Sequence, residues 1–342
     1  MTEIPEQKTT QAVPRAKTGA SGVTDALQFA QKFGVLIALV LLCIFLTFAN
    51  EYFLTGRNIT NVLRQVSING ILAIGMTFVI LTRGIDLSVG SIVALTGLVS
   101  ASFATTSSVA AVAGGPYPAW LAIGLGLVVG GAVGAISGLF VARYRVPAFV
   151  VTLGMLSAAR GLALLYAEGR PIPALTDSYR WIGTGEILRI PVPIVIFAIV
   201  FLVAWYVLNF TRFGRQVYAV GGNPHAAVVS GINEGRIQFS VYVISGALAG
   251  LAGMILAART GSALPQAGIA YELDAIAAVV IGGTSLMGGI GTVGGTLIGA
   301  LLIGIVNNGL DLLGVESYYQ QIIKGVLIVA AVLLDQSRNK RS

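Results

Sequence analysis

Long apolar stretches, separated by short polar segments, run through almost the whole chain. They occupy residues 33–50, 66–82, 85–106, 119–142, 147–167, 192–210, 238–258, 273–288, 292–310 and 319–335. Most of them approach the ~20 residues that an α-helix needs to cross the hydrocarbon core of a bilayer. The pattern therefore predicts an all-α polytopic membrane protein with about ten transmembrane helices.

The composition agrees with this prediction. Of the 342 residues, 56% are hydrophobic and only 10% are charged, whereas an ordinary soluble domain carries roughly 25% charged residues. So little charge cannot cover a water-facing surface, and a disordered chain would need the opposite composition. A single soluble domain and an intrinsically disordered chain are both excluded.

The basic residues indicate how the spans are oriented. An excess of them occurs in the two tails and in two loops: Lys8, Arg15, Lys17 and Lys32; Arg143 and Arg145; Arg212, Arg215 and Arg236; Arg338, Lys340 and Arg341. The basic residues of the loop 168–191 are balanced by an equal number of acidic ones. Cytoplasmic loops are enriched in Lys and Arg, and an even number of crossings puts all four segments on one side. We therefore expect both termini in the cytoplasm. The formal net charge of +7 then reflects topology, and no nucleic-acid partner is expected.

Three parts follow from this pattern. Residues 1–32 form a polar cytoplasmic tail, residues 33–336 a single transmembrane domain, and residues 337–342 a basic cytoplasmic tail. Within the transmembrane domain, glycines recur at every fourth position in the fourth and seventh runs: Gly126, Gly130, Gly134 and Gly138, then Gly246 and Gly250. Such ridges of small residues let two membrane helices approach closely.

The segment 82–91 places two charges and three hydroxyls where two apolar runs meet. If these runs form a tight helical pair, Arg83 and Asp86 lie at a cytoplasmic turn. Asp86 would then occupy the first turn of the third span, where a carboxylate complements the helix dipole. The alternative is a role in gating or in receiving a signal from a cytoplasmic partner.

Other polar residues inside the apolar runs are candidates for a translocation pathway, since such groups are costly in a membrane and usually face a protein interior or a water-filled path. Arg160 is near enough to the outer end of its run to snorkel; otherwise it pairs its helix with a neighbouring helix, or it lies on the path. Hydroxyls and amides in place of a charge cluster suit a neutral sugar or polyol. The pathway or gating candidates are Asn69, Arg83, Asp86, Ser88, Ser91, Thr96, Arg160, Asn307 and Asn308.

Missing motifs argue against an enzyme. The sequence contains no Gly-Lys-Ser/Thr of a phosphate-binding P-loop, one histidine and one cysteine. No cluster of His, Cys, Asp and Glu has the spacing of a metal site. We therefore expect no catalytic residue, no metal and no bound cofactor on this chain.

The loop 211–237 is the most unusual polar segment. Asn223 is a good helix cap, Pro224 suits the first helical position, and Gly231 suits a helix end. These signals predict a short, mildly apolar helix in the cytoplasm. Such a helix is expected to dock into a partner protein, although it could also lie on the lipid headgroups.

Three long motifs resemble the ribose-type permeases of monosaccharide ABC importers. They are Gly75–Ser91, Tyr271–Leu286 and Asn307–Gln320, within a resemblance that covers roughly residues 33–336. The resemblance implies a permease subunit that carries a monosaccharide, ribose first, across the bacterial inner membrane. Arg83 departs from the first motif, which has a small residue at this position.

The resemblance also implies partners. These are a second permease copy in a homodimer, an ATPase with two fused nucleotide-binding domains that holds ATP and Mg, and a periplasmic sugar-binding protein. The loop 211–237 matches the segment that couples such permeases to the ATPase. Its coupling residues are Gly221, Gly222, Asn223, Pro224, Ala226, Ala227 and Gly231.

The alternative is an ion-coupled secondary transporter of a small polar solute. Such carriers usually place acidic or histidine side chains near the bilayer midplane. Here Asp86, Glu272, Asp274 and Asp335 fall at the ends of the predicted spans, which disfavours this alternative.

Overall fold

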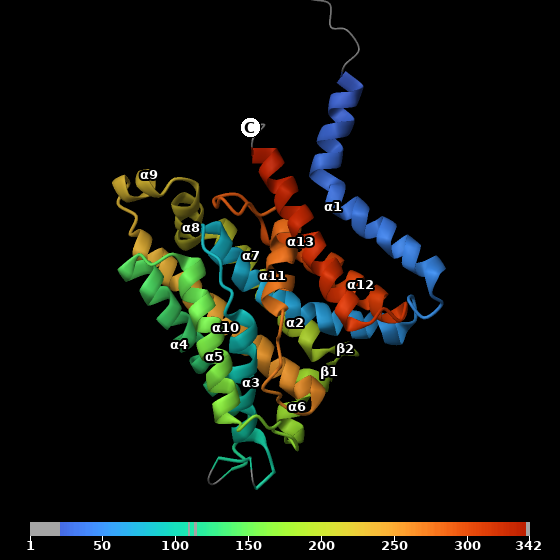
Figure 1. Ribbon diagram of the computed structural model, residues 1–342, viewed down its shortest axis with the longest axis vertical. Helices are drawn as coiled ribbons and strands as arrows, with labels where there is room; N and C mark the ends of the chain where they lie inside the picture. Colours follow the sequence, from blue (N-terminus) through green and yellow to red (C-terminus); the bar gives the residue numbers. More distant parts are fainter. Residues whose placement is uncertain (1–20, 109, 113–114, 340–342) are drawn as a thin grey trace, which may run out of the picture.

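The computed structural model describes residues 21–108, 110–112 and 115–339, which fold into α-helices and one short β-hairpin (Figure 1). The first five helices are α1 (Ser21–Ala49), α2 (Gly56–Leu81), α3 (Val89–Ala104), α4 (Ala119–Tyr144) and α5 (Ala148–Tyr166). Then follow α6 (Asp177–Thr184), β1 (Glu186–Ile187), β2 (Ile190–Pro191), α7 (Val192–Phe210), α8 (Arg212–Gly222) and α9 (Pro224–Val229). The last four are α10 (Glu234–Thr260), α11 (Tyr271–Ile281), α12 (Val293–Leu312) and α13 (Ser317–Asn339).

Six of the described helices are long and apolar enough to cross a membrane: α2, α4, α5, α7, α10 and α12. Two shorter apolar helices are α3 and the segment Gly34–Ala49 of α1. The all-α polytopic architecture follows, while the count of ten crossings stays a prediction. Of the predicted N-terminal tail, residues 1–20 lie outside the described part, and 21–32 already belong to α1.

The core of the molecule is built around α2 and α10. In the most apolar window of α2, 83% of the residues are buried, against 17% in α5 and 28% in α7. α10 packs against α2, α3 and α4, and α12 packs against α2 and α11. The outward faces of α5 and α7 carry large apolar side chains, which suits contact with lipid or with another chain. In Figure 1, α9 and both ends of the described chain lie toward the same end of the molecule.

The glycine ridge predicted in the fourth run packs against the glycines of the seventh. A Cβ on Gly130 would lie 2.4 Å from the carbonyl oxygen of Gly246, and one on Gly134 would lie 2.2 Å from the carbonyl oxygen of Tyr242. A Cβ on Gly250 would meet the carbonyl oxygen of Gly126 at 2.7 Å. α4 and α10 therefore touch backbone to backbone, as the spacing of small residues predicts.

The eighth predicted span, 273–288, is not one helix. α11 ends at Ile281 and has 11 residues, or about 16 Å at 1.5 Å per residue, which is half the ~30 Å of a bilayer core. The chain then continues as a glycine-rich loop with positive φ at Gly283, Gly288 and Gly289. Irregular backbone of this kind is tolerated at membrane depth where protein surrounds it.

The break between α2 and α3 also corrects an expectation. α3 begins at Val89 with Ser88 as its N-cap residue, so Asp86 lies before the helix and outside its first turn. Its side chain is fully buried and contacts Ser245, near the middle of α10. Asp86 therefore lies in the break between the two helices, as expected, but it is enclosed by the protein, and the expectation that it occupies the first turn of the third span is wrong.

Candidate coupling segment and translocation pathway

The predicted helix in the loop 211–237 is α9, and a second helix, α8, precedes it. Thr211 caps α8 by accepting from the backbone N–H of Gly214 at 3.1 Å. Asn223 caps α9 by accepting from the N–H of Ala226 at 3.0 Å, and Pro224 occupies the first position. Gly231, with φ +81°, follows the end of α9. The capping signals in the sequence thus placed α9 correctly, whereas α8 was not expected.

α9 presents an apolar face to the outside. The side chain of Val229 is 90% exposed and that of Val228 is 53% exposed. Ala226 is also exposed, but Ala227 is only 4% exposed and belongs to the core. Ala227 therefore packs against its own chain, so a contact of α9 with another protein would use Val228 and Val229 in its place.

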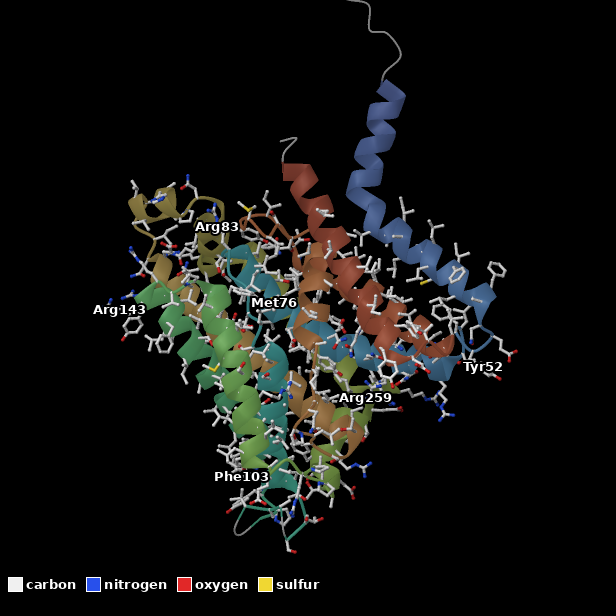
Figure 2. All side chains as sticks on the ribbon, viewed as in Figure 1. Tyr52, Met76, Arg83, Phe103, Arg143 and Arg259 are labelled. Carbon is white, nitrogen blue, oxygen red and sulfur yellow. The ribbon has the colours of Figure 1, made fainter. Side chains whose placement is uncertain are left out.

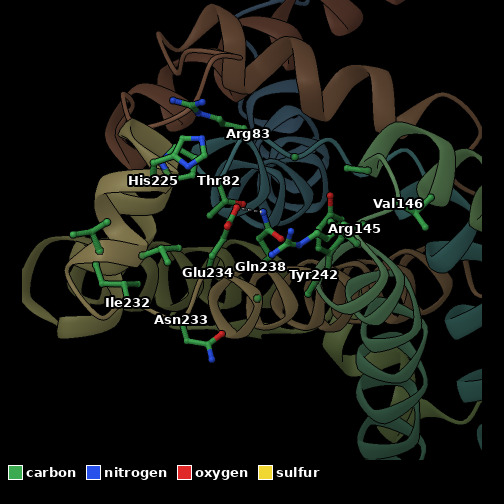
Figure 3. A pocket seen from close by; sticks show the side chains of 18 of the residues that line it. Thr82, Arg83, Arg145, Val146, His225, Ile232, Asn233, Glu234, Gln238 and Tyr242 are labelled. Atoms are coloured by element: carbon green, nitrogen blue, oxygen red, sulfur yellow. Dashed lines mark hydrogen bonds between the residues drawn. The ribbon is translucent and has the colours of Figure 1, made fainter.

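An open groove of about 1060 Å³ separates α9 from the α4–α5 turn and the start of α10 (Figure 3). Thr82, Arg83 and Tyr242 line its floor, with His225 on the α9 side. Gln238 donates to Glu234 across one turn of α10 at 3.1 Å. The turn after α2 is thus exposed beside α9, although the two segments are far apart in the sequence.

Asp86 is held by hydroxyl and backbone donors. Its Oδ1 accepts from the backbone N–H of Ser88 at 3.0 Å and from the Ser88 hydroxyl at 2.5 Å, and its Oδ2 accepts from the Ser245 hydroxyl at 2.8 Å. Next to it, the carbonyl oxygen of Ile85 accepts from the hydroxyl of Thr152 at 3.1 Å. These bonds connect the α2–α3 turn to α10 and α5, and they leave Asp86 without contact to water.

Arg160 is held by backbone carbonyl oxygens of neighbouring segments. Its Nη1 donates to the carbonyl oxygens of Pro265 at 2.6 Å and Ala267 at 2.8 Å, and its Nη2 lies 3.4 Å from the carbonyl oxygen of Gly90. The guanidinium therefore joins α5 to α3 and to the loop that connects α10 with α11. These contacts agree with the expectation that Arg160 pairs its helix with neighbouring segments, and a place along the path stays a prediction.

A second polar cluster joins α11, α12 and α13. Lys324 Nζ lies 3.1 Å from Asp274 Oδ2, and the Asn307 amide donates to the same oxygen at 3.3 Å. Nearby, Asn308 and Asn58 exchange amide hydrogen bonds of 2.8 and 3.0 Å between α12 and α2. The carboxylate of Asp274 is thus both paired and hydrogen-bonded, as a buried charge requires.

The remaining pathway candidates do not join either cluster. Asn69, Ser91 and Thr96 are buried in α2 and α3, and the Thr96 hydroxyl donates to the carbonyl oxygen of Ile92 in its own helix at 2.7 Å. The nine candidates therefore occupy several separate places. The sequence did not single out Ser245 and Asn58, which bond to the candidates Asp86 and Asn308. It also missed a separate polar pair, Arg259 and Asn61, in which Arg259 Nη2 lies 2.7 Å from Asn61 Oδ1.

Figure 2 shows how the charged side chains distribute around this core, with Arg83 and Arg143 toward the end that bears α9 and Arg259 away from it. The molecule thus combines an apolar helical body with enclosed polar clusters and a short apolar helix, α9, beside a groove, as a polytopic membrane protein would. This arrangement fits the membrane-spanning part of a transporter.

The comparison with family models identifies the class. The model described as "Branched-chain amino acid transport system / permease component" matches residues 58–332. The chain therefore belongs to this family of transport permeases and is a multi-pass membrane protein and a transport subunit. The comparison with solved structures returned no match.

Curated relatives cover nearly the whole chain. The ribose import permease RbsC of Haemophilus influenzae is 50% identical over 303 residues, which is 87% of this chain and 91% of that protein. RbsC of Escherichia coli K12 is 48% identical over 334 residues, or 96% and 99% of the two chains. The D-allose permease AlsC of E. coli K12 is 40% identical over 313 residues, or 91% and 94%. The resemblance to monosaccharide importer permeases is confirmed.

Proposed function

We propose that this chain is the membrane-spanning subunit of an ATP-driven importer for a monosaccharide in a bacterial inner membrane. The observation that carries the proposal is the near-complete alignment with the ribose import permease of E. coli, at 48% identity. Ribose is the first candidate because identity falls to 40% for the D-allose permease. The polar groups inside the molecule suit a neutral, hydroxylated solute.

The proposed assembly contains two copies of this chain, an ATPase with two fused nucleotide-binding domains, and a periplasmic sugar-binding protein. ATP and Mg bind to the ATPase, and this chain carries no cofactor. α9 is the proposed contact with the ATPase, supported by the exposed side chains of Val228 and Val229. Both termini and α9 then lie in the cytoplasm, with ten crossings in each copy.

Ion-coupled transport is the less favoured mechanism. Asp86 lies inside the molecule, but it is fully buried and accepts hydrogen bonds from Ser88 and Ser245. Asp274 is paired with Lys324. A carboxylate that carries an ion must exchange it with water, and neither group is free to do so in this conformation.

The test is uptake of radiolabelled ribose into vesicles that contain the purified permease, its ATPase and its binding protein. Uptake should require ATP and all three proteins, and unlabelled ribose should compete better than allose or xylose. The permease alone should bind ribose only weakly, since a tight site would trap the sugar. Uptake driven by a proton gradient without ATP would refute the proposal.

A further inference from the structure

The end of α2 is fastened to the end of α8 by one side chain. Arg83 Nε donates to the carbonyl oxygen of Gly221 at 2.6 Å, and its Nη2 donates to that of Gly222 at 2.7 Å. These carbonyls belong to the last turn of α8, where a helix lacks internal hydrogen-bond donors and a cation is favoured. α9 begins two residues later, at Pro224.

The same place is a three-way backbone contact. Gly289, in the loop after α11, donates its N–H to the carbonyl oxygen of Leu81 at 3.0 Å. A Cβ on Gly221 would lie 1.7 Å from that oxygen and 2.6 Å from the nitrogen of Gly289. The hydroxyl of Tyr218 on α8 donates to the carbonyl oxygen of Gly291 at 2.8 Å. Thus α8 cannot shift without displacing both the α2–α3 turn and the loop after α11.

The backbone of Arg83 is unusual for a residue with a side chain. Its φ is +65°, a left-handed conformation that glycine adopts freely and other residues avoid. The helix end at α11 has the same pattern of backbone bonds, with Gly283 donating to Val280 as Arg83 donates to Ile80. There the left-handed position is held by a glycine, with φ +90°. At position 83 the two hydrogen bonds of the Arg83 guanidinium give a physical reason for an arginine in place of glycine.

We propose that Arg83 is a positioning residue that transmits movement of the ATPase-facing segment to the α2–α3 turn and its buried Asp86. This inference rests on the proposed function, because only an ATPase bound at α9 would make movement pass from α9 toward the core. From Arg83 the chain reaches Asp86 in three residues, and Asp86 bonds to Ser245 in α10. A contact of a partner with α9 is therefore linked to the core by short stretches of backbone and by the hydrogen bonds of Arg83 and Asp86.

Only a guanidinium fits this role well. Its planar fork holds two neighbouring carbonyl oxygens at once, whereas a lysine ammonium is a single point of charge on a flexible stem. Arg83→Lys should thus keep the charge and lose the two-point contact. Arg83→Asn removes the side chain's reach while keeping a residue that tolerates positive φ, so the turn itself should still form.

The experiment measures both variants in the complete complex with ATPase and binding protein in vesicles. In Arg83→Asn we expect unchanged co-purification of the ATPase, unchanged basal ATP hydrolysis, and a loss of at least tenfold in ribose uptake and in stimulation of ATPase by binding protein. Arg83→Lys should fall between this variant and the wild type. The control is Arg143→Asn, since Arg143 is exposed at the same end and donates no hydrogen bond among the described residues; it should behave as wild type.

Each other outcome counts against the inference. Uptake by Arg83→Asn within twofold of wild type would show that the contact transmits nothing. Loss of the ATPase from the purified complex would show a role in assembly alone, and equal loss in Arg143→Asn would show a general effect of charge. If the wild type itself shows no ATP-dependent uptake, the proposed function fails first, which separates the two failures.

Discussion

The backbone contact between α4 and α10 gives a sharp prediction about stability. Gly130 and Gly131 are adjacent in the same helix, but they point to different surroundings. A Cβ on Gly130 would lie 2.4 Å from the carbonyl oxygen of Gly246 and 3.0 Å from the Cα of Gly250. A Cβ on Gly131 would lie 3.9 Å from Ala247 and 4.0 Å from Val243, which is ordinary contact.

The effect of one methyl group can be worked out from these distances. Gly130→Ala must push the helices apart by roughly 1 Å, because carbon and oxygen ordinarily stay about 3.3 Å or more apart. A gap of that size forfeits a quarter to a half of each dispersion contact across it, and overpacking typically costs ~1–3 kcal/mol. Replacing glycine by alanine also stabilises a helix by up to about 1 kcal/mol. Gly131→Ala should show this stabilisation without any clash.

The difference between the two variants therefore isolates the clash. Gly130→Ala should be less stable than Gly131→Ala by about 1–3 kcal/mol, measured by reversible unfolding of the detergent-solubilised protein in a denaturing detergent. Gly131→Ala should equal or exceed the wild type. A difference in the free energy of unfolding of less than about 0.5 kcal/mol between the two variants, which is the usual range for surface substitutions, would refute the packing argument.

Three further predictions concern the ends of the molecule. Lys324→Met should destabilise the protein by about 3–5 kcal/mol because it leaves Asp274 buried without its cation. The double variant that adds Asp274→Asn should regain most of this stability in thermal unfolding. A single variant as stable as the wild type would contradict the ion pair. Val229→Asp should weaken ATPase binding roughly 10- to 100-fold, since burying a valine contributes ~1.5–3 kcal/mol, and unchanged co-purification would exclude α9 as the contact. Single cysteines at Ser107 and Asp177 should react with an impermeant thiol reagent from outside the cell, and labelling only from inside would reverse the topology.

Features that depend on neighbouring residues were predictable from the sequence. α9 was found because its cap, its first-position proline and its terminal glycine stand within nine residues of one another. The glycine ridge of α4 was found because its period of four is visible in one segment. Both predictions needed only the geometry of a single helix.

Features that depend on distant partners were not predictable. The burial of Asp86 was not visible in the sequence because its bond to Ser245 spans 159 positions. The run 273–288 is mostly apolar, so hydrophobicity did not show that helix α11 stops at Ile281. The adjacent Gly282 and Gly283 were the available signal. α6 and the β1–β2 hairpin were missed because eight residues and two-residue strands leave almost no periodic pattern.

α11 shows how these distant contacts combine. At its first turn Asp274 favours the positive end of the helix dipole and pairs with Lys324 of α13. Beyond its last turn, Gly289 bonds to Leu81 beside Arg83 and the end of α8. Residues 274–280 are buried between α2, α12 and α13, so packing holds the middle of α11 and these polar contacts fix its two ends. If Arg83 transmits movement of α8 as proposed, the displacement should reach α11 at the loop after its last turn, through Gly289, while the ion pair ties its first turn to α13.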